Sequence, residues 1–240
     1  MNDEIQQSKM PSELGERLRR AAQRAIAIVT GSKEVWSEIR NEPGDVRSVY
    51  LNYLVFLAAI PAICGFIGKS VIGIGVPFLN ARIRMPFFGT LISQIVFYFG
   101  TLAMLYAVAV IMNLLAPKFG GKADILNSLK LLGYASTPGA IGGIFLLFPN
   151  ALFSLASLLL AIYGVYLIYQ NFSLFVEIPA EKRPAFAGGT VLGAIAAGIV
   201  FAICMMIVTP TPNLPSFKFN LPAAGDNEDF EQLQKRLMGK

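Results

Sequence analysis

Tyr134, Ser136, Thr137 and Pro138 lie at the centre of an apolar run, Leu129 to Pro149, that is long enough to cross a bilayer. Proline removes one backbone hydrogen bond from a helix. An unpaired carbonyl is costly in lipid, so the hydroxyls of Ser136 and Thr137, or neighbouring helices, must satisfy it. A broken helix at the membrane midplane is also where many transporters bind their substrates. The run therefore predicts the packed centre of a helical bundle or a substrate site.

Two glycines beside this break, Gly139 and Gly143, have the spacing at which small residues let helix backbones approach closely in a membrane. We therefore expect the segment to pack against other spans, with the glycines, Tyr134 and the break itself as its packing or functional residues. The alternative is a lipid-facing helix that contains a proline.

The residue types needed for most catalytic and metal sites are missing. The chain has no histidine, which excludes imidazole-activated nucleophiles and the usual zinc and haem ligand sets. The two cysteines, Cys64 and Cys204, lie in separate apolar runs, where cysteine behaves as a small hydrophobe. We expect no enzyme activity and no catalytic, cofactor-binding or metal-binding residues.

The composition is that of a membrane protein, with 55% apolar residues, 15% charged residues and a mean hydropathy of +0.58. We predict an all-α transmembrane bundle of five spans, at about residues 49–67, 88–115, 129–148, 151–172 and 186–208. Residues 1–48 are predicted to form a cytoplasmic region with amphipathic or interfacial helices. Residues 209–240 read as a proline-rich polar tail with one short helix.

The cytoplasmic region contains an amphipathic pattern followed by a second short helix. Apolar residues recur at helical spacing from Leu14 to Val29, and Arg17, Arg20 and Arg24 follow another side. This basic face is a candidate contact for the membrane surface or a partner protein. An ordinary solvated or bundle-capping helix is the alternative. Trp36, the only tryptophan, is predicted to anchor the second helix at the membrane interface.

Basic residues are distributed unequally between the two ends of the predicted bundle. The end that carries the N-terminus would hold eight: Lys33, Arg40, Arg47, Lys118, Lys122, Lys130, Lys182 and Arg183. The opposite end would hold four: Lys69, Arg82, Arg84 and Lys218. Because cytoplasmic flanks are enriched in lysine and arginine, the N-terminus is predicted inside and the C-terminus outside. The net charge of +5 does not predict nucleic-acid binding.

Through several motifs, the chain resembles the bacterial branch of the Yip domain family, the Ypt/Rab-interacting membrane proteins. These motifs are Trp36, Ile39 and Pro43 as Trp-x-x-Ile-x-x-x-Pro, then Gly133-Tyr134-Ala135-Ser136-Thr137-Pro138, Ile162-Tyr163 and Tyr166. The resemblance covers roughly residues 33–208 and implies a five-span bundle with a cytoplasmic N-terminus and without catalysis. Eukaryotic members are associated with vesicle traffic and Rab-type GTPases. This chain lacks their Asp-Leu-Tyr-Gly-Pro-type element before the first span, which argues against a small GTPase partner.

Two functions follow from these patterns. The first is a non-enzymatic scaffold or adaptor in the bacterial inner membrane, which acts on membrane organisation or a trafficking-like process. Its partners would be the bilayer and other membrane proteins or a second copy of the chain. The alternative is a small-molecule or ion transporter or channel that uses the broken third span. The spans lack acidic residues, histidine and arginine in their interiors, and coupling ions usually require such side chains.

Overall fold

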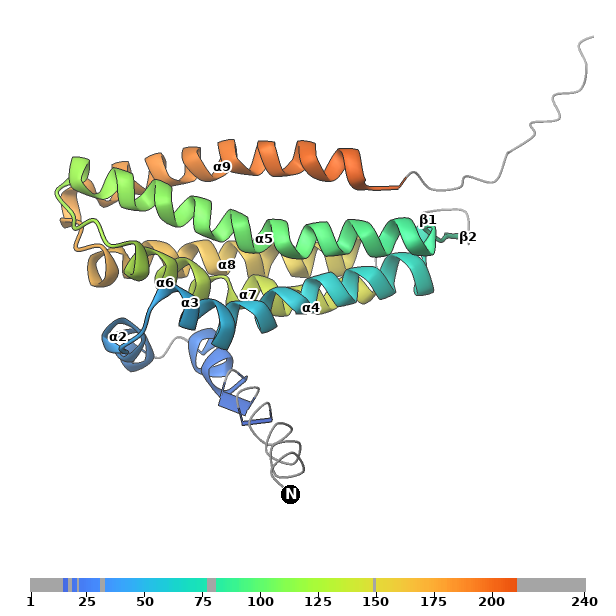
Figure 1. Ribbon diagram of the computed structural model, residues 1–240, viewed down its shortest axis with the longest axis horizontal. Coiled ribbons are helices and arrows are strands. Elements are labelled where there is room, and N and C mark those ends of the chain that lie inside the picture. Colours follow the sequence, from blue (N-terminus) through green and yellow to red (C-terminus); the bar gives the residue numbers. More distant parts are fainter. Residues whose placement is uncertain are drawn as a thin grey trace, which may run out of the picture.

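Helices account for most of the chain in a computed structural model that describes residues 15–16, 19–20, 22–30, 33–76, 81–148 and 150–210 (Figure 1). Residues 22–29 are helical and precede the labelled elements. Those elements are α2 (Lys33–Asn41), α3 (Val46–Val49), α4 (Val55–Phe66), β1 (Ile74–Val76), β2 (Ala81–Ile83), α5 (Phe87–Leu115), α6 (Ile125–Ala135), α7 (Thr137–Gly142), α8 (Ala151–Phe175) and α9 (Arg183–Val208).

Four uninterrupted helical stretches of the described chain are long and apolar enough to cross a membrane. They are Val46–Ile72, Phe87–Phe119, Ala151–Phe175 and Ala180–Val208. Their outer faces carry large apolar side chains such as Leu192 and Ile207, which are 70% and 81% exposed. A soluble monomer rarely exposes apolar surface on this scale. The chain is therefore a helical, multi-span membrane protein.

The predicted third span is not one helix. Helix α6 ends at Ala135, and α7 begins at Thr137 with Pro138 in its first turn. A tighter 3-10 segment then follows, from Gly143 to Leu147. Proline lacks the amide hydrogen that would continue the helical hydrogen bonds. The break therefore lies just before Pro138, as the sequence predicts. The described residues thus contain four uninterrupted spans where the sequence predicted five.

The first helical stretch is longer than predicted at both ends. Asp45 caps its start by accepting the amide hydrogen of Ser48 at 2.8 Å, and the Asp45 amide donates to the Ser48 hydroxyl at 3.0 Å. The stretch continues through α4 and a wide π-helical turn and ends at Ile72, before Gly73, whose φ of 87° suits glycine. The hairpin of β1 and β2 follows, with Ile74 opposite Ile83.

The broken segment lies between α4 and α8. A Cβ built on Gly139 would lie 3.4 Å from Ala161 Cα of α8, and one on Gly143 would lie 2.6 Å from Pro61 Cβ of α4. The two glycines therefore contact different helices, because the chain tightens between them. Figure 1 shows α4, α5, α8 and α9 side by side along the long axis, with α2 at one end and the hairpin at the other.

Candidate functional site

A chain of hydrogen bonds satisfies the backbone at the break. Pro138 cannot donate to the carbonyl of Tyr134, and the Thr137 hydroxyl donates to that carbonyl instead, at 2.5 Å. Ser136 Oγ donates to the carbonyl of Gly133 at 2.7 Å. The phenol of Tyr53, from the turn before α4, lies 2.7 Å from Thr137 Oγ1. Because the single Thr137 proton is already used, Tyr53 is the donor in that pair.

Tyr134 connects this network to the N-terminal region. Its ring packs on that of Tyr53, with centroids 4.4 Å apart and planes tilted by 38°. Its phenol oxygen accepts a hydrogen bond from Arg24 Nη1 at 3.1 Å, and the same nitrogen lies 2.8 Å from Glu42 Oε2. Burial disfavours the Arg24 charge, yet Tyr134 and Glu42 outweigh burial and raise the pKa of the guanidinium. Arg24 is therefore a fixed cation that holds the N-terminal helix against α6.

The position of Arg24 bears on the predicted basic face. Ile28, one helical turn after Arg24, is fully buried in the core, so both residues lie on the side that docks onto the bundle. Arg20 is exposed and forms a 3.3 Å surface ion pair with Glu16. Arg17 lies outside the described residues. Within the predicted basic face, Arg24 therefore contacts the bundle itself, as the bundle-capping alternative expects.

Lys130 is the second cation drawn into this region. Its side chain is only 3% exposed, and its ammonium donates to the carbonyl of Glu42 at 2.6 Å and to that of Arg40 at 3.3 Å. These carbonyls belong to the end of α2, where the helix dipole favours a cation. Lys130 therefore holds α2 on α6.

Trp36 is buried rather than placed in the lipid interface. Its indole is 3% exposed and packs edge-on against Phe175 of α8, with ring centroids 6.1 Å apart. Glu177 completes this contact between α2 and the bundle: its carboxylate lies 2.7 Å from Arg40 and 2.6 Å from Lys122. The hydrogen bond from Lys122 and the Arg40 charge lower the pKa of Glu177. The structure therefore corrects the prediction that Trp36 anchors the second helix at the membrane interface.

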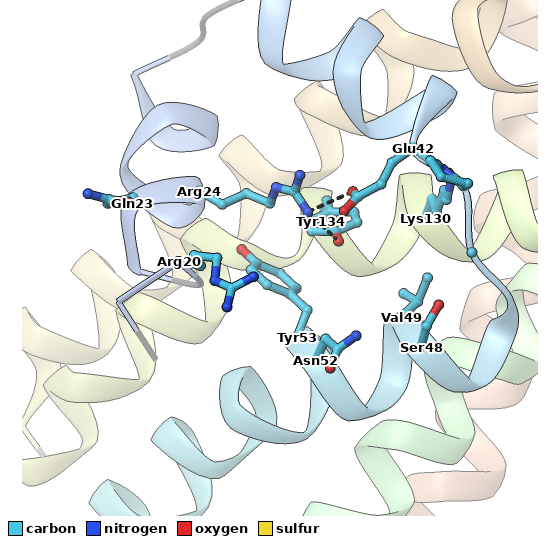
Figure 2. A pocket seen from close by; sticks show the side chains of 12 residues that line it. Arg20, Gln23, Arg24, Glu42, Ser48, Val49, Asn52, Tyr53, Lys130 and Tyr134 are labelled. Carbon is cyan, nitrogen blue, oxygen red and sulfur yellow. Dashed lines mark hydrogen bonds and ion pairs between the residues drawn. The ribbon is translucent and has the colours of Figure 1, made fainter. Parts of the chain in front are cut away.

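A polar cavity of about 520 Å³ opens between the N-terminal helix, the turn after α2, the start of the first long stretch and α6 (Figure 2). Its polar lining includes Arg20, Arg24, Glu42, Asn52, Lys130 and Tyr134. The three basic side chains and single carboxylate make the cavity electropositive. It contains no nucleophile paired with a base, and the described residues hold no cluster of metal-ligating side chains.

Comparison with known proteins identifies the fold family. Residues 26–207 match the Yip1 domain, which is more than half of the chain. The chain belongs to the Yip1 domain family. Within the family, it resembles the inner membrane protein YohC of Escherichia coli strain K12, at 25% identity over 172 residues that cover 70% of this chain and 87% of that protein. The YohC protein of strain O6:H1 gives the same values. No solved structure matches the chain.

The Yip1 domain assignment confirms the family resemblance inferred from the sequence. The residues that carried it, Tyr134 to Pro138, form the hydrogen-bonded break, and Trp36 and Pro43 lie where the N-terminal region docks onto the bundle. Sequence reasoning did not single out Tyr53, Glu42 or Glu177. Each acts on residues distant in sequence, and none stands in a motif of its own.

Proposed function

We propose that this Yip1 domain protein is a non-enzymatic scaffold or adaptor of the bacterial inner membrane, where its matched relative YohC is placed by name. The N-terminal region and α2 form its cytoplasmic working surface, and the spans act as a rigid support. Its partners are the bilayer and other membrane proteins or a second copy of the chain, with no small GTPase among them.

We infer that residues 125–147 make a fifth crossing, which fits this arrangement. Gly164 packs against Ala135 at the middle of the segment, and Gly142 packs against Leu160 further along. The segment therefore runs antiparallel to α8. Near its far end Leu146 contacts Gly68, which follows α4 and lies shortly before β1. Figure 1 shows β1 at the end of the bundle opposite α2. With five crossings, the basic-rich end that carries α2 is cytoplasmic and the C-terminal end is outside.

The hydrogen bonding at the break favours an adaptor over a transporter. A substrate site in a broken span needs polar groups that are free to bind. The hydroxyls of Ser136, Thr137 and Tyr53 instead donate within the break, and the first two satisfy backbone carbonyls. The polar groups of the break thus bond to one another and to the backbone, as in a structural element. The polar surface available to partners then lies at the α2 end.

The proposal is tested with two variants, each of which reverses two positive charges at one end of the bundle. Arg19→Glu with Lys118→Glu changes exposed residues at the proposed cytoplasmic end, and Arg82→Glu with Arg84→Glu changes exposed residues in the hairpin and directly after it. We expect the first pair to abolish rescue of a deletion strain's phenotype and the second to rescue fully, at equal membrane levels. The reverse pattern would contradict an adaptor that acts through the α2 end.

Vesicles distinguish the adaptor from the transporter directly. Vesicles reconstituted with the pure protein should be no more permeable to sodium, potassium, protons or chloride than protein-free vesicles. A protein-dependent flux that Thr137→Ala alters would favour transport through the broken segment instead.

A further inference from the structure

We propose that the electropositive cavity in Figure 2 binds a phosphate ester anion, supplied by the headgroup of an anionic phospholipid such as phosphatidylglycerol. The inference goes beyond the adaptor proposal, because it assigns a ligand to a site and does not depend on any protein partner.

Lys130 is the first observation that points to an anion. Lys130 is 3% exposed, and a buried cation is costly unless nearby charges compensate it; Glu42 and Asp124 act on it only at a distance. Among the described residues it forms hydrogen bonds to two carbonyls and no ion pair with a carboxylate. An ammonium has three donors, so one remains for a ligand in the cavity that Lys130 lines.

Arg24 offers the second set of donors. Its guanidinium lies over the Tyr134 ring, 5.4 Å from the ring centroid, and both of its polar contacts, to Tyr134 and Glu42, run through Nη1. Nε and Nη2 therefore have no partner among the described residues. The planar fork of a guanidinium matches two oxygens of a phosphate. The contacts with Tyr134 and Glu42 hold this fork in place before a ligand arrives, which lowers the entropy cost of binding.

Arg20 and Asn52 also contribute to the polar lining. Arg20 adds a third positive charge to the lining and forms a surface ion pair with Glu16, which is not a lining residue; Glu42, the one carboxylate that lines the cavity, already contacts Arg24. Asn52 forms no described hydrogen bond and lines the wall formed by the first long helical stretch. Its amide can donate to a phosphate or glycerol oxygen.

The depth of the cavity in the molecule favours a lipid as the source of the phosphate. The cavity lies beside the first residues of the Val46–Ile72 stretch, where a spanning helix enters the headgroup layer. Leu51, next to Asn52 in the chain, is 48% exposed and offers apolar surface to acyl chains at this level. Basic pockets between spans on the cytoplasmic side are a known type of anionic headgroup site.

The test measures the unfolding temperature of the full chain in a neutral detergent with three short-chain probes. These are dioctanoyl phosphatidylglycerol, dioctanoyl phosphatidylcholine with the same tails, and water-soluble glycerol 3-phosphate. We expect phosphatidylglycerol to raise the unfolding temperature in a saturable and salt-sensitive way, and phosphatidylcholine to have little effect.

Asn52→Asp is the decisive variant, because it keeps side-chain size, breaks no described contact and places a carboxylate in the cavity. We expect it to weaken phosphatidylglycerol binding by about tenfold or more. Asn41→Asp is the matched control, exposed at the end of α2 and outside the cavity lining. Arg20→Gln should also weaken binding, whereas Arg47→Gln, exposed on α3 and outside the lining, should not.

The outcomes separate the alternatives. Selective loss in Asn52→Asp and Arg20→Gln supports the phosphate site. Equal stabilisation by glycerol 3-phosphate and phosphatidylglycerol supports the site but makes a soluble phosphate ester its ligand. Equal stabilisation of all variants by phosphatidylglycerol, or of none, overturns the proposal. None of these results depends on rescue of a phenotype, so the adaptor proposal and this site fail independently.

Discussion

Tyr134 joins three parts of the molecule through three different groups. Its carbonyl accepts from Thr137, its ring packs on Tyr53, and its phenol oxygen accepts from Arg24. The carbonyl is available because Pro138 cannot donate to it. Tyr134 therefore takes part both in the hydrogen bonds of the break and in the docking of the N-terminal helix. Substitutions near Tyr134 should affect both.

Thr137→Val should destabilise the bundle by about 1–3 kcal/mol, because it leaves the Tyr134 carbonyl and the Tyr53 phenol without their shared partner. Thermal unfolding in detergent measures the effect. Thr190→Val in α9 is the control: Thr190 Oγ1 is buried without a partner among the described residues, so its removal should be neutral or stabilising. Equal losses in the two variants would mean that the network at the break contributes nothing specific.

The two glycines of the predicted packing motif should respond differently to alanine. Gly143→Ala places a methyl group against the backbone of Pro61, which lies within 2.8 Å of it, and should cost about 1–3 kcal/mol. Gly139→Ala meets Ala161 at ordinary contact distance within a helix and should be neutral or slightly stabilising. Unfolding temperatures of the two variants test this difference, and a larger loss for Gly139→Ala would contradict the described packing.

Helix α2 depends on few contacts for its place on the bundle. Trp36 packs on Phe175, Lys130 binds its C-terminal carbonyls, and Arg40 reaches Glu177. Glu177 has a positive φ of 56°, a conformation that costs energy in a residue with a side chain. Its ion pairs with Arg40 and Lys122 offset that cost, so the docking of α2 should be sensitive to the charge of Glu177.

Acidification should loosen α2. The pKa of Glu177 is lowered below its ordinary value of 4.5, so its contribution to stability is present above pH 4.5 and is lost as the pH falls through the folded-state pKa. The fluorescence of Trp36, the only tryptophan, should shift to longer wavelength in that range as the indole leaves Phe175. Asp45, the cap of α3, also has a lowered pKa and titrates in the same direction.

Glu177→Gln separates the two carboxylates. It removes the ion pairs but keeps Asp45, and its Trp36 emission should already be shifted at neutral pH, with a smaller acid response. An unchanged acid transition in this variant would assign the response to Asp45 or to another group.

At the scale of the whole molecule, the number of crossings decides the topology. A reporter active only outside the cytoplasm should be silent when fused after Lys122 or Lys182 and active after Asn150 or Pro210. Asn150 is the critical position, because it follows the broken segment and precedes α8. Activity after Asn150 requires that residues 125–147 cross the membrane despite the break. A silent fusion there would leave four crossings and return the C-terminus to the cytoplasmic side.

The sequence alone determined the class of the protein, four of its helical spans and the place of the break. Long apolar runs in a chain poor in charge have few folded solutions outside a membrane, and Pro138 interrupts any helix that contains it. The role of the Ser136 and Thr137 hydroxyls followed from the same local argument and is confirmed by their bonds to the Gly133 and Tyr134 carbonyls.

The tertiary structure decided which surfaces are free. Arg24, Lys130 and Trp36 look exposed in the sequence because each lies in a polar or flanking segment, yet each is drawn inward by a partner far along the chain: Tyr134, the end of α2 and Phe175. The two glycines of the predicted packing motif likewise contact different helices, Gly139 contacting α8 and Gly143 contacting α4, because the helix changes to a tighter 3-10 form after Gly142. Local pattern fixes backbone periodicity, but the partner of a side chain depends on how elements distant in sequence pack together, and that information is absent from any single stretch.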